Sequence, residues 1–380
     1  MKKAVVIGAG QTGRGYVARF LFQRDYEITF IDKNEELVRM LDEDKAFCIH
    51  FYKRDRTPIY IHDFKAYTTY SSEATQAIKE ADFIFTSTGE QNLGDVANQV
   101  KDAMKGKTKK TVFLTAENGI NPARVLRNHL IDAGIDSEYT VTQTAVFTST
   151  VSIHDTRLDT LSMNESYFPY DADELDELDF EGALPVHNFE KFFKRKIYTY
   201  NCLAGLISYC GYIKGYEVYG DAACDPDVDE TMMRLMEELN PALQDYFQIT
   251  KEDQEAFTER ALAKFRDKSI LDYNIKNGRA PMRKLGPTER IMSPMQILLD
   301  HDKDPRILEF VAAAALVYWE ELQGKSEPKL EKDLITTFCE INDLSGDEDV
   351  VKHVKEYLYE IKKHRDNINI IDIVFGKKHA

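Results

Sequence analysis

The sequence predicts an α/β domain built on a parallel sheet, followed by a mostly α-helical domain. Up to about residue 150, short apolar strands alternate with helical stretches, a pattern typical of a parallel sheet covered by helices on both faces. A glycine-rich turn joins the first strand to the first helix. Beyond about residue 188 strand signals almost vanish and long helical stretches follow.

The first strand, residues 4–7, runs directly into a G-x-G-x-x-G turn formed by Gly8, Gly10 and Gly13. The first glycine permits a tight strand-to-helix turn, and the second lets the backbone approach a pyrophosphate. The third lets the helix pack close to the strand. A second apolar strand, residues 28–31, ends in Asp32. Strand, turn, helix, strand and acid thus follow in the order of a dinucleotide-binding unit.

This order of elements predicts a Rossmann-type domain that binds NAD. The start of the helix, with Gln11 and Thr12, offers free N–H groups to the phosphates. Asp32 can accept a hydrogen bond from a ribose 2′-hydroxyl and would repel a 2′-phosphate, so NAD is favoured over NADP. A glycine turn with a purely structural role is the alternative.

Further strands are expected at residues 59–61, 82–89, 111–116 and 139–146. In a parallel α/β sheet the ligand lies across the carboxyl ends of the strands. Thr88 and Glu117, which follow two of these strands, are therefore expected at the cofactor.

The domains are predicted to cover residues 1–187, which bind NAD, and residues 188–380, a helical substrate and catalytic domain. Helices are expected at 189–216, 231–247, 253–265 and 306–322.

The composition limits the classes of partner that this chain is expected to bind. A net charge of −16 and a pI near 5.1 argue against nucleic acid, which requires a concentrated basic surface. The longest apolar run, residues 311–319, is too short for a bilayer, and the start of the chain does not resemble a signal peptide. Five scattered cysteines indicate reduced thiols. We therefore expect a cytoplasmic protein with a small-molecule partner and no membrane, and we read the acidic run 171–181 as a solvated segment rather than a metal site.

One stretch in the second half carries residues suited to catalysis. Lys196 and Asn201 are five positions apart, about 140° around an α-helix, so they share one broad face if the helix is slightly distorted. Oxidation of an alcohol needs a base for the hydroxyl proton, which a partly buried lysine can supply. It also needs a donor for the oxyanion, which an amide can supply. A surface lysine beside a helix-bonding asparagine is the alternative.

Several motifs in order give the chain a family resemblance. They are the glycine turn, Glu117-Asn118, residues 182–185, Lys196 with Asn201, residues 211–215 and residues 278–285. As a set they resemble the polyol-specific long-chain dehydrogenases over nearly the whole chain. The resemblance implies NAD-dependent interconversion of a polyol, or a polyol phosphate, with the ketose. It also implies Lys196 as general base, with Asn201 and Asn118 holding the reacting oxygen.

The sequence departs from the family pattern at two places. The family motif ends in a histidine where this chain has Ala204, and an Asp-Arg pair is replaced by Phe147-Thr148. Loss of one such hydrogen-bonding group can cost ~10²–10³ in rate. The alternative function is therefore a catalytically impaired homologue that binds NAD or a metabolite. Flanking groups are expected to pack or to lie at the surface: Tyr200, Cys202, Tyr209, His154 and His187.

A basic group stands out in this acidic chain: Arg279, Arg283 and Lys284, with Arg290 close by. In the context of the resemblance, it is expected to bind a sugar phosphate, because arginine makes bidentate contacts to phosphate. Interdomain salt bridges are the alternative. The sequence gives no sign of the oligomeric state.

Overall fold

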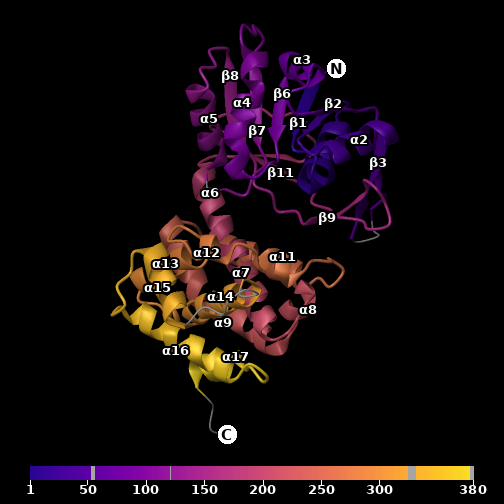
Figure 1. Cartoon of the computed structure of the whole chain (residues 1–380). Helices are drawn as coiled ribbons and strands as arrows, with labels where there is room; N and C mark the ends of the chain where they lie inside the picture. Colours follow the sequence, from indigo (N-terminus) through magenta and orange to yellow (C-terminus); the bar gives the residue numbers. More distant parts are fainter. Residues whose placement is uncertain (53–55, 120, 324–330, 377–380) are drawn as a thin grey trace. The chain divides into compact units, whose positions relative to one another are not determined.

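The computed structural model describes residues 1–52, 56–119, 121–323 and 331–376. The chain divides into two compact units, residues 1–193 and 194–380 (Figure 1). Helix α6 (Phe189–Lys196) contains the point of division. The boundary expected after residue 187, between an NAD-binding domain and a substrate and catalytic domain, stays a prediction.

The N-terminal unit is built on a six-stranded parallel sheet in the order β5-β2-β1-β6-β7-β8 (Figure 1). Side chains alternate across this sheet, since Val5 and Ile7 of β1 pack into one core, and Ala4 and Val6 pack into the other. The strands are β1 (Lys3–Ile7), β2 (Glu27–Asp32), β5 (Lys65–Thr68), β6 (Phe83–Thr86), β7 (Thr111–Thr115) and β8 (Tyr139–Gln143). This strand order is that of the Rossmann fold, and it reverses between β1 and β6. The predicted α/β domain is confirmed.

Helices cover both faces of the sheet. Apolar side chains of α3 (Ser72–Glu80), α4 (Leu93–Met104) and α5 (Pro122–Asp132) fill the core on one face. The other face is covered by a π-helical turn η1 (Gly13–Val17), α1 (Ala18–Phe22) and α2 (Glu35–Asp44). A short 3₁₀ turn, η2 (Glu90–Asn92), precedes α4.

A second, four-stranded sheet packs on the side of η1 and α1, in the order β4-β3-β10-β9. Its strands are β3 (Ala46–Phe51), β4 (Ile59–His62), β9 (Thr150–Ser152) and β10 (Thr160–Ser162). A separate pair is formed by β11 (Phe168–Asp171) and β12 (Ala183–Val186). The strands expected at 82–89, 111–116 and 139–146 are confirmed as β6, β7 and β8. The strand expected at 59–61 is also present, but it lies antiparallel to β3 in this second sheet.

The second unit is helical, as predicted, and α7 (Cys202–Ile213) lies at its core. Long helices α9 (Pro226–Phe247), α10 (Lys251–Phe265), α14 (Arg306–Gln323) and α16 (Asp349–Lys363) build most of the rest. Shorter ones are α8 (Tyr219–Ala223), α11 (Asn274–Gly278), α12 (Pro281–Lys284), α13 (Met292–Asp300), α15 (Glu331–Asn342) and α17 (Ile370–Phe375). The continuous helix expected over 189–216 is instead interrupted by a π-helical turn, η3 (Ile197–Asn201), between α6 and α7.

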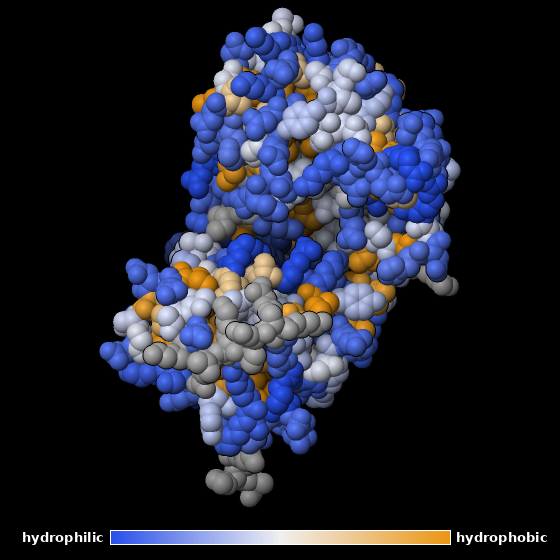
Figure 2. Space-filling view, in the orientation of Figure 1, coloured by the Kyte–Doolittle hydropathy of each residue, from blue (hydrophilic) through white to orange (hydrophobic). Residues whose placement is uncertain are grey.

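Hydrophilic residues cover most of the face shown in Figure 2, with apolar residues scattered between them. Among the helices of the described residues, none has the length and apolarity needed to cross a bilayer. All five cysteines are free thiols.

Candidate active site

The glycine turn after β1 has the close backbone approaches that its sequence predicts. Gly8 has a φ of +96°, and a Cβ there would lie 2.6 Å from the Ser87 carbonyl oxygen. A Cβ on Gly13 would collide with the Gly8 carbonyl, so the helix approaches the strand as closely as the backbone allows. No atom lies within 4 Å of the corresponding position at Gly10. The turn is therefore tightly packed at Gly8 and Gly13 and open at Gly10, the glycine that a pyrophosphate would approach.

Asp32 at the end of β2 supports this turn. Its carboxylate accepts hydrogen bonds from the Ala9 N–H at 2.7 Å and from the Asn34 N–H at 2.9 Å. Each bond uses a different oxygen, so each oxygen keeps a lone pair for a ligand hydroxyl. Asp32 lines a cleft of about 420 Å³ together with Gly8, Gly10 and Thr88.

The loop after β6 forms the opposite wall of the cleft. Glu117 is buried, and its two carboxylate oxygens accept from the N–H groups of Thr88 and Gly89, each at 2.8 Å. The Ser87 hydroxyl donates to the Gly8 carbonyl at 2.7 Å and so ties this loop to the glycine turn. Glu117 thus holds the loop from behind. Its position after a strand was recognisable from the sequence, but its use by backbone amides was not.

The other predicted cofactor residues lie at the start of η1, where Gln11 is exposed and Thr12 is half-buried. Asn118 is exposed just beyond the end of β7. The structure therefore gathers the glycines, Asp32 and Thr88 around one cleft and places Glu117 behind it.

In the helical unit, Lys196 and Asn201 bracket the η3 turn. The Cys202 N–H donates to the Ile197 carbonyl, a bond that spans five residues instead of the four of an α-helix. This wider turn brings residues five positions apart toward the same side of the helix, which is the distortion that the Lys196–Asn201 spacing requires. The helix is therefore distorted at the predicted place, and the shared role of Lys196 and Asn201 stays a prediction.

Lys196 is buried in an electropositive environment. Burial, reinforced by the positive charges of Arg290 and Lys264, lowers the pKa of Lys196 to about 7. At neutral pH, Lys196 is therefore uncharged in a large fraction of the protein molecules. A neutral amine can accept a proton, whereas an ordinary surface lysine remains an ammonium.

Further cations lie near Arg290. Lys284 is buried, its ammonium donates to the Asn277 carbonyl, and burial together with Arg290, Arg283 and Arg279 lowers its pKa to about 6. The Arg290 side chain is 13% exposed, and its Nε lies 3.5 Å from the Glu289 carboxylate oxygen Oε2. Arg279 and Arg283 are exposed, and Arg283 forms an ion pair with Glu289. The predicted basic group thus combines Arg279, Arg283 and Arg290 with Glu289 and with Lys284, which is largely uncharged at neutral pH and whose charged form a bound anion would favour.

Ala204 is half-buried on α7. A Cβ on the next residue, Gly205, would lie 3.6 Å from the Arg290 side chain, so Arg290 packs against this part of α7. Phe147, at the second departure from the family pattern, is buried, with ring centroids 5.9 Å from Tyr167 and 6.0 Å from Phe192. Phe147 therefore belongs to a buried aromatic cluster.

The flanking candidate groups have structural partners. The buried Tyr209 hydroxyl donates to the Gly278 carbonyl at 3.1 Å, and Tyr200 packs edge-on against Phe257. Burial raises the pKa of the Cys202 thiol to about 12, which suppresses the thiolate. His187 pairs with Asp173 at 2.6 Å, and His154 is exposed.

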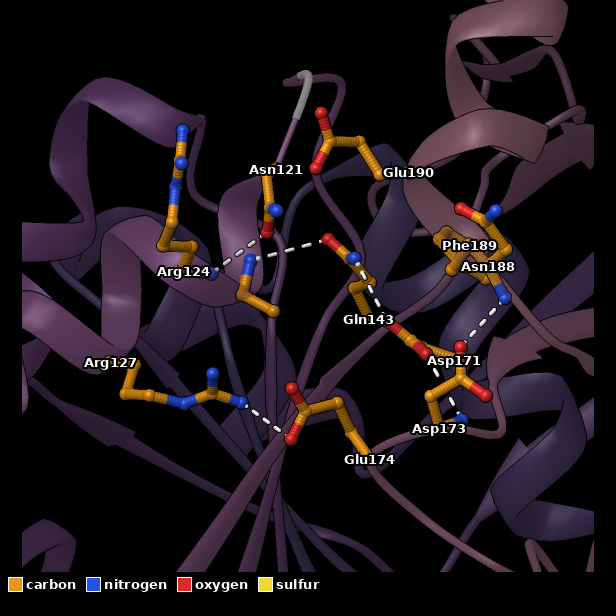
Figure 3. Close-up of a pocket in the computed structure, with 11 residues that line it drawn as sticks. Asn121, Arg124, Arg127, Gln143, Asp171, Asp173, Glu174, Asn188, Phe189 and Glu190 are labelled. Carbon is orange, nitrogen blue, oxygen red and sulfur yellow. Dashed lines mark hydrogen bonds and ion pairs between the residues drawn. The ribbon is translucent and has the colours of Figure 1, made fainter. Parts of the chain in front are cut away.

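A second hollow, of about 230 Å³, lies beside β8 and α5 of the N-terminal unit (Figure 3). Gln143 donates to Asp171 at 3.1 Å, and Arg127 forms an ion pair with Glu174 at 2.7 Å. Acidic and basic side chains are mixed around it, so it favours no single ligand charge. Within the part of the chain that the structure describes, no three His, Cys, Asp or Glu side chains gather as a metal site.

Comparisons with known proteins agree over both units. The family model described as the mannitol dehydrogenase Rossmann domain matches residues 2–207, and the mannitol dehydrogenase C-terminal domain matches residues 188–372. Mannitol-1-phosphate 5-dehydrogenase of Thermoanaerobacter pseudethanolicus is 24% identical over 96% of this chain and 99% of that protein. The enzyme of the same name from Shouchella clausii is 26% identical over 93% of this chain and 99% of that protein.

Solved structures share the fold. Pseudomonas fluorescens mannitol 2-dehydrogenase, in a ternary complex with NAD and D-mannitol, superposes with a TM-score of 0.75 at 12% identity, covering 96% of this chain and 92% of that chain. A substrate-free D-sorbitol dehydrogenase gives a TM-score of 0.73 at 12% identity, covering 98% and 94%.

A Rossmann unit followed by a helical unit, with these relatives, defines the class of protein: an oxidoreductase that acts on CH–OH groups. Within this class, the chain belongs to the mannitol dehydrogenase family.

Proposed function

We propose that the protein is an NAD-dependent dehydrogenase that interconverts a polyol phosphate, such as mannitol 1-phosphate, and the corresponding ketose phosphate. The observation that carries this proposal is a buried Lys196 with a pKa near 7, separated from Asn201 by a single π-helical turn. Family membership supplies the reaction class, and this pair supplies groups of the right chemistry for it.

The residues of the N-terminal cleft fit NAD. Gly8 and Gly13 pack the turn tightly, Gly10 leaves the backbone open to a pyrophosphate, and Gln11 and Thr12 begin the helix that would face it. Asp32 has carboxylate lone pairs for a ribose hydroxyl, and Thr88 lines the cleft while Glu117 holds the loop. Bound NAD would supply the acceptor for the hydride that leaves the alcohol carbon.

Lys196 is the proposed general base. Its neutral amine takes the hydroxyl proton during oxidation, and the resulting ammonium returns the proton during reduction. The Asn201 amide donates to the reacting oxygen, where negative charge develops. Asn118 belongs to the other unit and enters this proposal through the family resemblance alone.

The cationic cluster favours a phosphorylated substrate. Lys284 and Arg290 are largely withdrawn from water, and Arg279 and Arg283 lie at the surface close to them. A phosphate would offset this excess of positive charge and accept charge-assisted hydrogen bonds. The named relatives, which are mannitol-1-phosphate dehydrogenases, are consistent with this choice.

A second candidate is a protein that binds NAD or a metabolite without catalysing the reaction. The absence of an imidazole at Ala204 and the buried aromatic Phe147 favour it. Under this second function, substrate turnover is absent, but NADH still binds.

Steady-state assays with NAD and mannitol 1-phosphate, and with unphosphorylated mannitol, separate the two functions. The proposal expects turnover with both, and kcat/KM at least about tenfold higher for the phosphate, since one charge-assisted hydrogen bond accounts for a factor of that size. NADH binding without turnover of either polyol, or of the matching ketoses, would establish the second candidate instead.

A further inference from the structure

The η3 turn is an unusual local structure held by a specific set of contacts. π-Helical turns are rare and occur mostly as single insertions within α-helices. In a regular α-helix, Lys196 and Asn201 would point about 140° apart. The helix on either side, α6 and α7, is α-helical, so the inserted residue is confined to this one turn.

One buried amide bridges this turn to the neighbouring helix. Gln254 of α10 is fully buried, and its Oε1 accepts from the Arg195 Nε at 2.9 Å. Its Nε2 donates to the Thr199 hydroxyl at 3.2 Å. Gln254 therefore binds the residue immediately before Lys196 and the middle residue of η3 with the two ends of a single amide group.

The orientation of Gln254 is itself fixed. Its Nε2 also donates to Asn240 Oδ1 at 3.1 Å, and the same oxygen accepts from the Thr258 hydroxyl at 2.8 Å. Because Asn240 Oδ1 is an acceptor, it faces the amide nitrogen, and the Gln254 oxygen points to Arg195.

Arg195 is fixed in turn by α10. Its Nη1 contacts Asp253 Oδ2 at 2.8 Å, its Nη2 donates to the Asp253 carbonyl at 2.8 Å, and its guanidinium lies 4.3 Å from the Phe257 ring centroid. The end of α6 and the η3 turn are thus anchored to one neighbouring helix by a connected polar network.

We propose that Gln254 is a positioning residue that keeps η3 π-helical and thereby holds Lys196 and Asn201 on one side of the helix. This inference rests on the proposed function, because it concerns the geometry of the proposed base and oxyanion donor. Without the amide, the turn can return to the four-residue pattern, and Asn201 rotates away from Lys196.

The test compares Gln254→Met in the full-length protein with Thr231→Val. Methionine keeps the side-chain length and removes the hydrogen bonds to Arg195 of α6 and to Thr199 of η3. Thr231 is buried on α9 and donates to the Asp227 carbonyl at 2.6 Å, so its substitution removes a buried hydrogen bond far from η3 in sequence and network. We expect Gln254→Met to lower kcat about 100-fold, with the KM and the Kd for NADH changed less than threefold. Thr231→Val should leave kcat within threefold.

A second variant tests the bond itself. Thr199→Val is nearly isosteric and removes only the hydroxyl on η3 that contacts Gln254. We expect a loss of about tenfold in kcat, and the double variant should be no slower than Gln254→Met alone, because both changes remove the same link.

Amide hydrogen exchange over residues 197–202 supplies a readout that does not need turnover. Gln254→Met should accelerate exchange there at least about tenfold, and Thr231→Val should not. If Gln254→Met matches Thr231→Val in both kcat and exchange, the positioning role is wrong while the dehydrogenase assignment stands. If the wild-type protein shows no turnover but Gln254→Met still accelerates exchange over residues 197–202, the proposed function is wrong, while the role of Gln254 in stabilising η3 stands.

Discussion

The two units form their candidate sites in different ways. In the N-terminal unit, the key feature is backbone geometry: Gly8 and Gly13 leave no room for a Cβ, and Gly10 faces open space. In the helical unit, the key feature is a set of buried side chains, with Lys196 and Lys284 made less basic by burial and by neighbouring cations.

This difference sets how each unit tolerates substitution. Gly8 and Gly13 tolerate no larger residue, since a Cβ at either position would collide with Ser87 or with the turn itself. A group of cations can be rearranged, because one donor can take the place of another.

The largest expected effect comes from removing the proposed base. Lys196→Ala should lower kcat by about 10²–10⁴-fold, the usual contribution of a general base, without changing the Kd for NADH. Steady-state kinetics and NADH fluorescence titration measure the two quantities. The control is Lys191→Ala, a half-buried lysine of the same helix that should change kcat less than threefold. Equal effects of the two substitutions would remove Lys196 from the mechanism.

Substitution of Arg290 should produce the next largest effect. Arg290→Met is expected to lower kcat/KM for mannitol 1-phosphate about 10–100-fold, the size of a lost charge-assisted hydrogen bond, and to affect mannitol less. Because the charge of Arg290 helps to lower the pKa of Lys196, that pKa should rise in the variant. Arg260→Met, at an exposed arginine of the same unit, is the control. A uniform loss for both polyols would show that Arg290 does not bind the phosphate.

In the N-terminal unit, Asp32→Ala should weaken NAD binding and reduce the preference for NAD over NADP, each by about 10–30-fold. The variant loses the acceptor for the ribose and the bond to the Ala9 N–H. Binding titrations with both nucleotides measure the ratio. An unchanged ratio would mean that Asp32 only supports the turn.

The smallest effect is expected from restoring the family residue. Ala204→His should raise kcat by less than about tenfold, because the proposed base and the Asn201 amide are already present. A missing oxyanion donor costs ~10²–10³ in rate, so an increase of that size would favour the impaired homologue. Single-turnover rates with NAD and mannitol 1-phosphate distinguish these outcomes.

Much of the N-terminal unit was predictable, because its determinants are local in sequence. The turn glycines, the apolar strands and Asp32 all lie within short segments whose periodicity or spacing is diagnostic. The second sheet was missed except for β4, since β9 and β10 are three residues each and depend on β3, more than one hundred positions earlier.

The helical unit was predictable in class but not in its details. Lys196 and Asn201 were proposed from their spacing and the family resemblance, and their roles stay a prediction. The π-helical turn between them was not predicted, because its contacts reach residues far away in the sequence, such as Gln254. Nothing near Gln254 in the sequence distinguishes it from a surface residue of an amphipathic helix. Likewise, the low basicity of Lys284 results from burial beside Arg290, which only the folded chain reveals.

The proposed reaction depends most on Lys196 acting as a base with a pKa near 7. The direct test is the pH dependence of kcat/KM for polyol oxidation, which reports the free enzyme. Oxidation requires the neutral amine, so kcat/KM should rise about tenfold per pH unit below 7 and become level above it, while ketose reduction should fall above 7. A rate of oxidation that keeps rising toward pH 10, or that is independent of pH between 5 and 9, would contradict the account.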